Sequence, residues 1–300
     1  YSAGLFYCDK YFIAPPSNSP DFPEFLMELC KKEKIKLVIP TIDEELPLFA
    51  SYKDIFASIG VTLLVSDSKS IAICNDKYLL CNYLEKQNIP AASSFLGFEM
   101  NEQNKQFPLF IKPRFGKGSE SAYRIDDELD LEYYLRKLKN PVIQEFLEGS
   151  EYTIDVMADF SGNVLAVVPR ERVKVRAGVT DCGITRNSSI LIDAGIKICK
   201  KLELAGPVNI QGKIINNQFK TFEVNPRFSG GIPLTIASGC DFPLMIIQLV
   251  LQKNIKSRIG DFVEDLVMIC HEEPVFRRES NDASFQTLYQ NNLKIIGSLK

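Results

Sequence analysis

Apolar residues in the first part of the chain form two kinds of run, one at helical spacing and one continuous. Apolar residues recur at helical spacing in two segments. These are SPDFPEFLMELCKKEK (19–34), which begins with Ser and Asp, and DEELPLFASYKDIFASIG (43–60). The short continuous runs, which predict strands, are IKLVIPT (35–41) and VTLLVS (61–66). Strands that alternate with helices in this way are typical of a parallel α/β sheet. One further βα unit would complete such a domain, and we expect that unit to be missing from the N-terminal end.

From residue 67 onward the pattern changes to helices mixed with longer strand-like runs. A helical stretch over 67–98 precedes the strand FPLFIKPR, and DDELDLEYYLRKLK (126–139) predicts a helix with an acidic first turn. The strand-like runs that follow are PVIQEFL, EYTIDVMAD, VLAVVPRERVKV, VNIQGKII and FKTFEVN. Their short connections predict antiparallel pairing.

Three further segments complete the pattern. NSSILIDAGIKICKKLEL predicts a helix that interrupts the strands. Residues 232–252 predict a last long helix, and KVRAGVTDCGITR (174–186) is interpreted as a loop on the substrate side.

The composition excludes several classes of partner. The chain has 300 residues, of which 45% are hydrophobic, enough for a core and for about two domains. The net charge is -3 and the pI is about 5.5, so no basic face favours nucleic acid or an anionic membrane. The longest apolar runs, such as LMIIQLVLQ (244–252), are too short to span a bilayer. We therefore expect neither nucleic acid nor a membrane as a partner.

Cysteine and histidine usage limits the kinds of catalytic and metal site that the sequence can form. The 8 cysteines are irregularly spaced and form no CxxC pair, which predicts reduced, mostly buried thiols in a cytoplasmic protein. His271 is the single histidine, so neither a histidine-rich zinc site nor a Ser–His–Asp hydrolase is expected. An enzyme with this sequence would use carboxylates, amides, lysines and arginines, with a hard metal ion.

A glycine- and serine-rich loop, GKGSES (116–121), follows the strand FPLFIKPR. It falls one residue short of the dinucleotide fingerprint and lacks the spacing of the P-loop. Glycines at 116 and 118 let backbone N–H groups approach phosphate, and Lys117 and Ser119 add charge and donors. The sequence leaves two interpretations open. The segment is either a phosphate-binding loop, formed by Gly116, Lys117, Gly118 and Ser119, or an ordinary surface hairpin.

Two lysines stand where lysine is unfavourable. Lys112 lies inside the apolar strand LFIKP, and a buried lysine needs an anion; the alternative is an edge strand with Lys112 facing solvent. Lys77 follows Asn75 and Asp76 at a predicted helix start, where the helix dipole disfavours a positive charge. Both lysines are therefore candidates for ligand binding.

The stretch VIQEFLEGSEYTID (142–155) places polar groups around a glycine turn between two strands. Adenine needs backbone donors and acceptors from an extended segment, and ribose needs a carboxylate. The backbone of Glu145, Phe146 and Leu147, beside Gln144, is a candidate for the first role. Glu151 is the candidate for the second. The alternative is solvated charge at the strand ends.

The stretch FEVNPRFSGG (222–231) carries a carboxylate, an amide and a guanidinium at every second position. In a strand Glu223, Asn225 and Arg227 would share one face. A hairpin loop over 216–218 would place Gln211 opposite Glu223, whereas a strict two-residue loop would put them on opposite faces. Gln211, Glu223 and Asn225 would then form an oxygen cluster suited to Mg²⁺ (or Mn²⁺), and Arg227 would reach a transferred phosphate. The alternative is a hydrogen-bonded solvent face.

The order of these motifs resembles that of the ATP-grasp superfamily. The motifs run NDK, FIKP with its glycine-rich loop, QEFLEGSEYTIDV, NIQ and FEVNPRFSGG. The carbamoyl-phosphate synthase large-subunit-like branch is the most similar. The resemblance covers about residues 1–250, and YCDKYFIAPP and VIPTIDEEL resemble the pre-ATP-grasp segment of the family.

The resemblance implies a fold and a division into domains. A partial pre-ATP-grasp parallel α/β domain would occupy 1–70. An ATP-grasp module of two α+β lobes would follow over 71–255, with the small lobe at about 76–147 and the large lobe at about 148–255. Residues 256–300 would form a C-terminal extension.

The resemblance also implies roles for the candidate residues. ATP would be bound by Lys77, Lys112, Gly116, Lys117, Gly118, Ser119, Gln144, Glu145, Phe146, Leu147 and Glu151. The metal would be held by Gln211, Glu223 and Asn225, and the glutamine at 211 leaves one or two metal ions open. Arg227 would stabilise the transition state that leads to an acyl phosphate. Arg176 and Arg186 are candidates to bind the substrate carboxylate, or are ordinary surface arginines.

The function implied is that of an ATP- and Mg-dependent, ADP-forming carboxylate–amine (or thiol) ligase acting on a small carboxylate, such as an amino acid. The chain holds at most one synthetase half, and no glutaminase Cys–His pair is visible. One alternative is a subunit of a split carbamoyl-phosphate synthase, and another is a non-catalytic ATP-binding regulatory module. The expected partners are the small-molecule carboxylate and amine, and a homodimer is left open.

Overall fold

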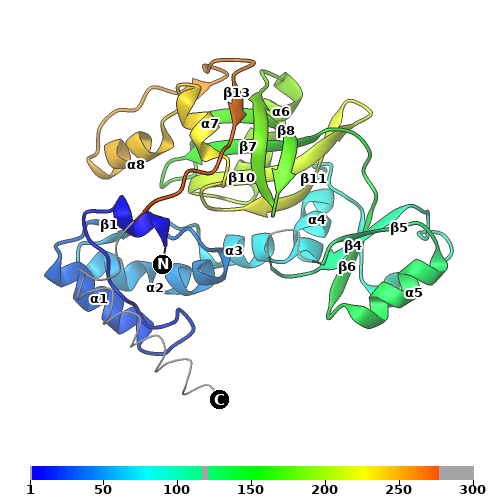
Figure 1. The fold of residues 1–300 in the computed structure, drawn as a ribbon, viewed down its shortest axis with the longest axis horizontal. Coiled ribbons are helices and arrows are strands. Elements are labelled where there is room, and N and C mark those ends of the chain that lie inside the picture. Colours follow the sequence, from blue (N-terminus) through cyan, green and yellow to red (C-terminus); the bar gives the residue numbers. More distant parts are fainter. Residues whose placement is uncertain (1, 117–120, 277–300) are drawn as a thin grey trace. The chain divides into compact units, whose positions relative to one another are not determined.

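The computed structural model describes residues 2–116 and 121–276. Residues Glu33–Cys270 form one compact unit, and the N-terminal residues up to Lys32 belong to another. In the latter the described elements are a 3-10 helix, η1 (Ala3–Phe6), and the helix α1 (Phe22–Lys32). The structure of Glu33–Cys270 is described next because it contains all the candidate site residues that the structure resolves (Figure 1).

The unit begins with a small parallel α/β element. Its two strands, β1 (Leu37–Val38) and β2 (Thr62–Leu63), form a parallel pair. The helix α2 (Leu46–Ser58) lies between them in the sequence. The 3-10 helix η2 (Asp43–Glu45) leads into α2, and α3 (Ser68–Asn75) follows β2. The predicted parallel α/β arrangement is confirmed here.

A small antiparallel sheet follows, in the order β3-β6-β4-β5. Leu109, Ile111, Ile125, Leu131 and Ile143 form its buried core against the helix α5. The elements in chain order are β3 (Ser94–Phe95), η3 (Gly97–Glu99), β4 (Leu109–Pro113), β5 (Tyr123–Ile125), α5 (Glu128–Lys137) and β6 (Pro141–Glu145).

A larger sheet contains the remaining predicted strands, in the order β11-β10-β7-β8-β9-β13, with β12 paired in parallel to β8. The pairs among β7 to β11 and between β9 and β13 are antiparallel, as the short connections predicted. The strands are β7 (Glu151–Ala158), β8 (Val164–Arg176), β9 (Val179–Thr185), β10 (Gly206–Ile215), β11 (Gln218–Asn225), β12 (Arg258–Ile259) and β13 (Val267–Ile269).

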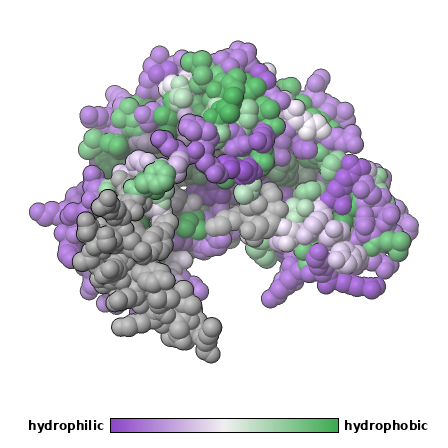
Figure 2. Space-filling model, in the orientation of Figure 1, coloured by the Kyte–Doolittle hydropathy of each residue, from purple (hydrophilic) through white to green (hydrophobic). Residues whose placement is uncertain are grey.

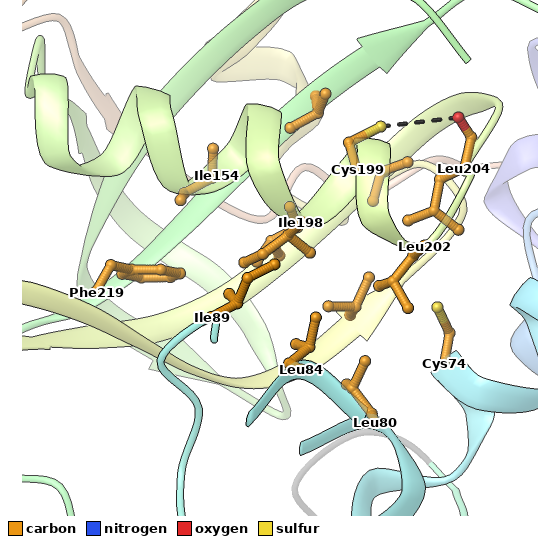
Figure 3. Close-up of a cluster of buried hydrophobic side chains, with 14 of the residues drawn as sticks. Cys74, Leu80, Leu84, Ile89, Ile154, Ile198, Cys199, Leu202, Leu204 and Phe219 are labelled. Carbon is orange, nitrogen blue, oxygen red and sulfur yellow. Dashed lines mark hydrogen bonds between the residues drawn. The ribbon is translucent and has the colours of Figure 1, made fainter. Parts of the chain in front are cut away.

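The helices α4 (Lys77–Lys86) and α6 (Ser189–Lys201) pack on one face of this sheet. Figure 3 shows their contact: Leu80 and Leu84 of α4 meet Ile198 of α6 together with Ile154 and Phe219 from the strands. Because the apolar side chains of β7, β10 and β11 point to these helices, their alternate residues point to the opposite face. That opposite face carries the polar residues of the candidate site.

Three sequence-based expectations of secondary structure were wrong. The helical stretch expected over 67–98 is two helices, α3 and α4, followed by the strand β3. Residues 174–186 are not a loop but the end of β8, a two-residue turn at Ala177 and Gly178, and β9. Both turn residues have positive φ, 47° and 78°, as tight hairpins require. Residues 232–252 are two helices, α7 (Ile232–Ala237) and α8 (Phe242–Val250), because Gly239 has a φ of 103° and Asp241 caps α8.

The thiols and the surface agree with the composition. Every cysteine is free, and most are buried, namely Cys30, Cys74, Cys81, Cys199 and Cys240. Figure 2 shows apolar side chains gathered near β13, where Val267 and Ile269 are exposed. Within the described residues, no helix is both long and apolar enough to cross a bilayer.

Candidate functional site

A cavity of about 920 Å³ is lined by both sheets of the Glu33–Cys270 unit. This volume is at the upper end of the range for ligand sites, which is about 300–1,000 Å³. The cavity therefore has room for a nucleotide and a second small molecule. Among the predicted site residues, those that line it are Lys77, Lys112, Gly116, Gln144, Glu145, Phe146, Leu147, Glu151, Gln211, Glu223 and Arg227.

The β10–β11 hairpin brings Gln211 directly opposite Glu223, as predicted. The predicted three-residue loop is wrong, however, because Asn216 and Asn217 form a two-residue turn with φ of 50° and 60°. The register instead shifts at a β-bulge between Gln211 and Gly212. The bulge adds one residue to β11, and this returns Glu223 to the face of Gln211.

Amide and carboxylate oxygens gather at this register. The Asn225 amide donates to Glu223 Oε1 at 3.3 Å and lies 3.5 Å from Asn209 Oδ1, and Gln211 Nε2 donates to Asn209 Oδ1 at 3.0 Å. Among the described residues, no group of three His, Cys, Asp or Glu side chains is placed to hold a metal ion. One carboxylate with amide oxygens nevertheless fits Mg²⁺, which takes few protein ligands when phosphate oxygens and water complete its shell.

Lys112 lies at this face on β4, an interior strand between β6 and β5, so the edge-strand alternative is wrong. Its side chain is 7% exposed, and its ammonium is 5.0 Å from the centre of the Phe222 ring and 3.5 Å from the Phe222 carbonyl oxygen. Burial lowers the pKa of Lys112, although the nearby Glu223 opposes the shift. A buried ammonium with so few partners is suited to bind an anion.

Lys77 is also buried and begins α4, where the Asp76 carboxylate caps the helix by accepting from the N–H groups of Tyr78 and Leu79. Its ammonium donates to the carbonyl oxygen of Gly116 at 2.6 Å. Lys77 therefore holds Gly116, the first residue of the glycine-rich loop, by a hydrogen bond. The candidates Lys117, Gly118 and Ser119 lie outside the described residues.

The segment from β6 to β7 is held by side chains from the large sheet. Glu145 accepts from Ser93 N at 2.9 Å and from Lys220 Nζ at 2.8 Å, and Lys213 Nζ donates to the Leu147 carbonyl oxygen at 2.8 Å. Glu145 is thus part of an ion pair and not solvated strand-end charge. These contacts fix the extended backbone next to the Phe146 ring.

Glu151 forms an ion pair with Arg172 of β8, a residue that the sequence interpretation missed. The Arg172 guanidinium also donates to Gln211 Oε1 at 3.2 Å and to the Gly178 carbonyl oxygen at 2.7 Å. It therefore links the residue proposed for ribose to the residue proposed for the metal. The signal was the alternation of Arg170, Arg172 and Lys174 along the strand.

A second missed pair is fully buried. Arg170 Nε donates to Asp155 Oδ2 at 2.8 Å, and Arg170 Nη2 donates to Asp155 Oδ1 at 3.1 Å and to Ser229 Oγ at 3.0 Å. Thr235 donates to the same carboxylate at 2.6 Å. An aspartate inside the apolar run TIDVMA was the signal that could have revealed the pair.

Arg227 lines the cavity two residues beyond the end of β11, so it does not continue the strand face of Glu223 and Asn225 as expected, and it pairs with Asp43 of η2. By contrast, the structure places Arg176 and Arg186 outside the cavity lining. Arg176 reaches Asp181 at 3.5 Å, and Arg186 pairs with Glu171 at 2.7 Å. Each side chain is therefore occupied by an acidic partner on the β8–β9 hairpin, although residues 177–180 of the same hairpin line the cavity.

Two parts of the chain match known protein families in sequence. Residues 137–269 match the family described as ATP-grasp in the biosynthetic pathway with Ter operon, and residues 1–64 match the PylC-like N-terminal domain. The carbamoyl phosphate synthase large chain of Clostridium acetobutylicum is 24% identical over 277 residues, which are 85% of this chain and 26% of that protein. The chain thus spans about a quarter of the length of this relative.

Solved structures are similar over most of the chain at low identity. One is the biotin carboxylase domain dimer of Hydrogenobacter thermophilus 2-oxoglutarate carboxylase in complex with MgADP, ADP and bicarbonate; its TM-score is 0.69 at 14% identity, with 88% of this chain and 64% of that chain covered. Another is the L-amino acid ligase of Bacillus licheniformis, with a TM-score of 0.62 at 18% identity and coverage of 84% and 63%.

An N-terminal pre-ATP-grasp segment and an ATP-grasp domain follow one another in the order that the motifs predicted. The chain thus carries an ATP-grasp domain, and it has distant similarity to the carbamoyl phosphate synthase large chain and, in its fold, to biotin carboxylase.

Proposed function

We propose that this protein is an ADP-forming ligase that activates a small carboxylate as an acyl phosphate and joins it to an amine or a thiol. The observation that carries the proposal is the placement of Glu223, Asn225 and Gln211 in one cluster, close to the buried ammonium of Lys112. This combination offers a hard carboxylate ligand and a buried cation to the same triphosphate.

In the proposed complex, the small lobe (76–147) and the large lobe (148–255) both contact ATP. The backbone of 145–147 binds adenine beside Gln144, and Glu151 binds the ribose. Lys77 and Lys112 bind phosphate oxygens, and the loop of Gly116, Lys117, Gly118 and Ser119 covers them. Mg²⁺ (or Mn²⁺), held by Glu223 and Asn225 with Gln211 beside them, would neutralise phosphate charge.

The reaction then proceeds in two steps. A carboxylate oxygen attacks the γ-phosphorus, the bond from that phosphorus to the β–γ bridging oxygen breaks, and ADP leaves with the electron pair. Arg227 donates hydrogen bonds to the oxygens of the phosphoryl group as their charge grows. In the second step the amine nitrogen attacks the acyl carbon, phosphate leaves with the electron pair of the C–O bond, and the nitrogen loses a proton to the leaving phosphate or to solvent.

Isotope transfer tests this reaction directly. Candidate acids labelled with ¹⁸O in the carboxylate are incubated with the protein, Mg-ATP and a mixture of amines, and ADP and phosphate are analysed. We expect ¹⁸O in the released phosphate for the true acid, and no turnover in the Glu223→Gln variant. ADP release without ¹⁸O transfer from any acid would contradict acyl-phosphate chemistry.

A second candidate is supported by the similarity to the carbamoyl phosphate synthase large chain. Because the chain spans about a quarter of that protein, it would act as one subunit of a split synthase. Bicarbonate and ammonia should then stimulate ADP release when other acids do not. Tight ATP binding without hydrolysis, whatever acid or partner is added, would instead favour a non-catalytic regulatory module.

The similar biotin carboxylase domain is a dimer, and we propose a homodimer for this chain on that basis. Light scattering of the purified protein tests the proposal.

A further inference from the structure

Two arginines on β8 were given no contact with ATP in the complex proposed above. Arg170 and Arg172 both line the cavity, and both are buried along most of their length, with 1% and 5% of their side chains exposed. They alternate with Glu171, which pairs with Arg186 away from the cavity lining. The two guanidinium groups therefore belong to the polar face of the large sheet.

Strand register fixes where on this face they lie. Glu223 pairs with Gln211, Gln211 with Thr153, and Thr153 with Arg170, so these four residues form one row across β11, β10, β7 and β8. Three strand spacings separate the two ends of the row, which is about 14 Å between Cα atoms. The carboxylate proposed for the metal and the arginine thus stand at opposite ends of one row, and both line the cavity.

Each arginine has one buried nitrogen without a partner among the described residues, namely Nη1 of Arg170 and Nε of Arg172. The other nitrogens are engaged by Asp155, Glu151 and neighbouring oxygens. Buried donors that have lost water and gained no acceptor are costly, and they are commonly found where a ligand supplies the acceptor. Guanidinium groups match the planar, two-oxygen geometry of carboxylates.

A glycine of the cavity lining lies directly against one of these donors. A Cβ atom on Gly231 would lie 2.3 Å from Arg170 Nη1. The φ of Gly231 is -96°, which any residue adopts, so the glycine is required by the guanidinium and not by the backbone. Gly230 is similarly confined, because a Cβ there would lie 2.8 Å from the Val179 side chain.

We infer that Arg170 and Arg172, with the 229–231 segment, form the subsite that binds the carboxylate of the acid substrate. This inference rests on the proposed function and assigns its acid end. The triphosphate lies over β10 and β11, and the acid lies over β8 with its reacting oxygen directed along the row toward Glu223. The wall of Val179 and Gly230 beside the subsite favours a small acid.

The test uses acetate, L-alanine and bicarbonate, each labelled with ¹³C at the carboxyl carbon and titrated into the full chain loaded with Mg-ADP. Broadening of the ¹³C signal reports carboxylate binding, and calorimetry reports the Kd for Mg-ADP. We expect Arg172→Gln to weaken carboxylate binding and to weaken Mg-ADP binding as well, because it removes the ion-pair partner of Glu151. We expect Arg170→Lys to weaken carboxylate binding by about tenfold or more while the Kd for Mg-ADP stays that of the wild type. Gly231→Ala, which keeps both arginines but places a methyl group on Nη1, should do the same.

The control is Arg136→Gln, which removes a guanidinium that is 82% exposed on α5 and should leave both measurements unchanged. Weaker Mg-ADP binding with unchanged carboxylate binding would mean that the two arginines bind the phosphate groups of the nucleotide. No change in any of the three variants, or no broadening with wild type, overturns the subsite. Failure of wild type to bind Mg-ADP would instead overturn the proposed function and the inference with it.

Discussion

Arg227 and Asp43 form a double ion pair although 184 residues separate them in the sequence. Nε of Arg227 lies 2.8 Å from Oδ1 of Asp43, and Nη2 lies 2.6 Å from Oδ2. The third nitrogen of the guanidinium, Nη1, donates to the Phe228 carbonyl oxygen at 2.8 Å. Asp43 precedes the first long helix of the Glu33–Cys270 unit, so the N-terminal α/β element orients a side chain at the end of β11.

We expect Asp43→Asn to lower kcat while the Kd for ATP changes little. The substitution leaves Arg227 in place but removes the carboxylate that fixes its direction, and a misplaced group costs up to about 10²-fold. Arg227→Ala should cost about 2.7–4 kcal/mol of transition-state stabilisation, or roughly 10²–10³-fold. The matched control is Asp265→Asn, which removes the partner of Arg186 outside the cavity lining. Equal kcat for Asp43→Asn and wild type would contradict the orienting role.

Glu223→Gln should abolish Mg²⁺-dependent turnover. Glu223 is the carboxylate of the cluster with Asn225 and Gln211, and an amide in its place cannot neutralise a metal ion. ATP binding should weaken less, because the contacts proposed for adenine and ribose come from residues 144–151. Single-turnover assays at increasing Mg²⁺, with a melting curve to show intact folding, make the measurement. A variant that reached the wild-type kcat at high Mg²⁺ would argue for a modest electrostatic role.

Lys112 predicts a pH dependence of ATP binding. Burial lowers its pKa below the ordinary value of 10.5, and bound phosphate would favour the protonated form. ATP binding should therefore take up a proton, and affinity should fall as the pH rises through the lowered pKa of the free protein. Calorimetry in buffers of different ionisation enthalpy measures the uptake. Lys112→Arg keeps the charge and should remove the pH dependence.

The burial of Lys112 also predicts whether its replacement raises or lowers the stability of the free protein. Below its lowered pKa, Lys112 is a buried cation with few partners, so Lys112→Met should stabilise the free protein there while it weakens ATP binding. The gain should shrink as the pH rises from the lowered pKa toward 10.5, because only the unfolded chain then binds the proton. Denaturation at several pH values tests this. A variant that was less stable than wild type at all pH values would show that Lys112 serves the fold.

Asp155→Ala should destabilise the protein by about 3–5 kcal/mol, because it leaves Arg170 buried without its counter-ion. Glu132→Gln is the control: it removes an exposed i,i+4 pair with Arg136, which contributes at most about 0.5 kcal/mol. Urea denaturation of the two variants compares them. A loss for Asp155→Ala as small as that of the control would mean that Arg170 relaxes into water.

Gly212→Ala should disturb the register that assembles the cluster. A Cβ on Gly212 would lie 2.3 Å from the Lys220 carbonyl oxygen, so the bulge must shift, at a cost of about 1–3 kcal/mol. Mg²⁺ dependence should be impaired along with stability. Gly97→Ala is the control, because its Cβ would meet only the end of the flexible Leu135 side chain, at 3.1 Å. Wild-type stability and Mg²⁺ response in Gly212→Ala would contradict the role of the bulge.

Local patterns were sufficient for most of the secondary structure. The alternation of apolar and polar residues in β7, β10 and β11 predicted both the strands and their polar face, because a pleated strand has a period of two. The ordered motifs predicted the superfamily. The prediction of one helix over 232–252 failed where Gly239 and the Asp241 cap compete with apolar periodicity.

The sequence by itself determined most of the helices and strands, and that Glu223, Asn225 and Arg227 belong to one polar stretch. Only the tertiary structure decided that a bulge at Gln211 sets the register, and that Lys112 lies in an interior strand. It also decided that Arg227 meets Asp43 and that Arg170 is buried. The physical reason is that local periodicity depends on the geometry of each element alone. Side-chain partners depend on which elements pack together, and that is decided by the burial of the whole unit.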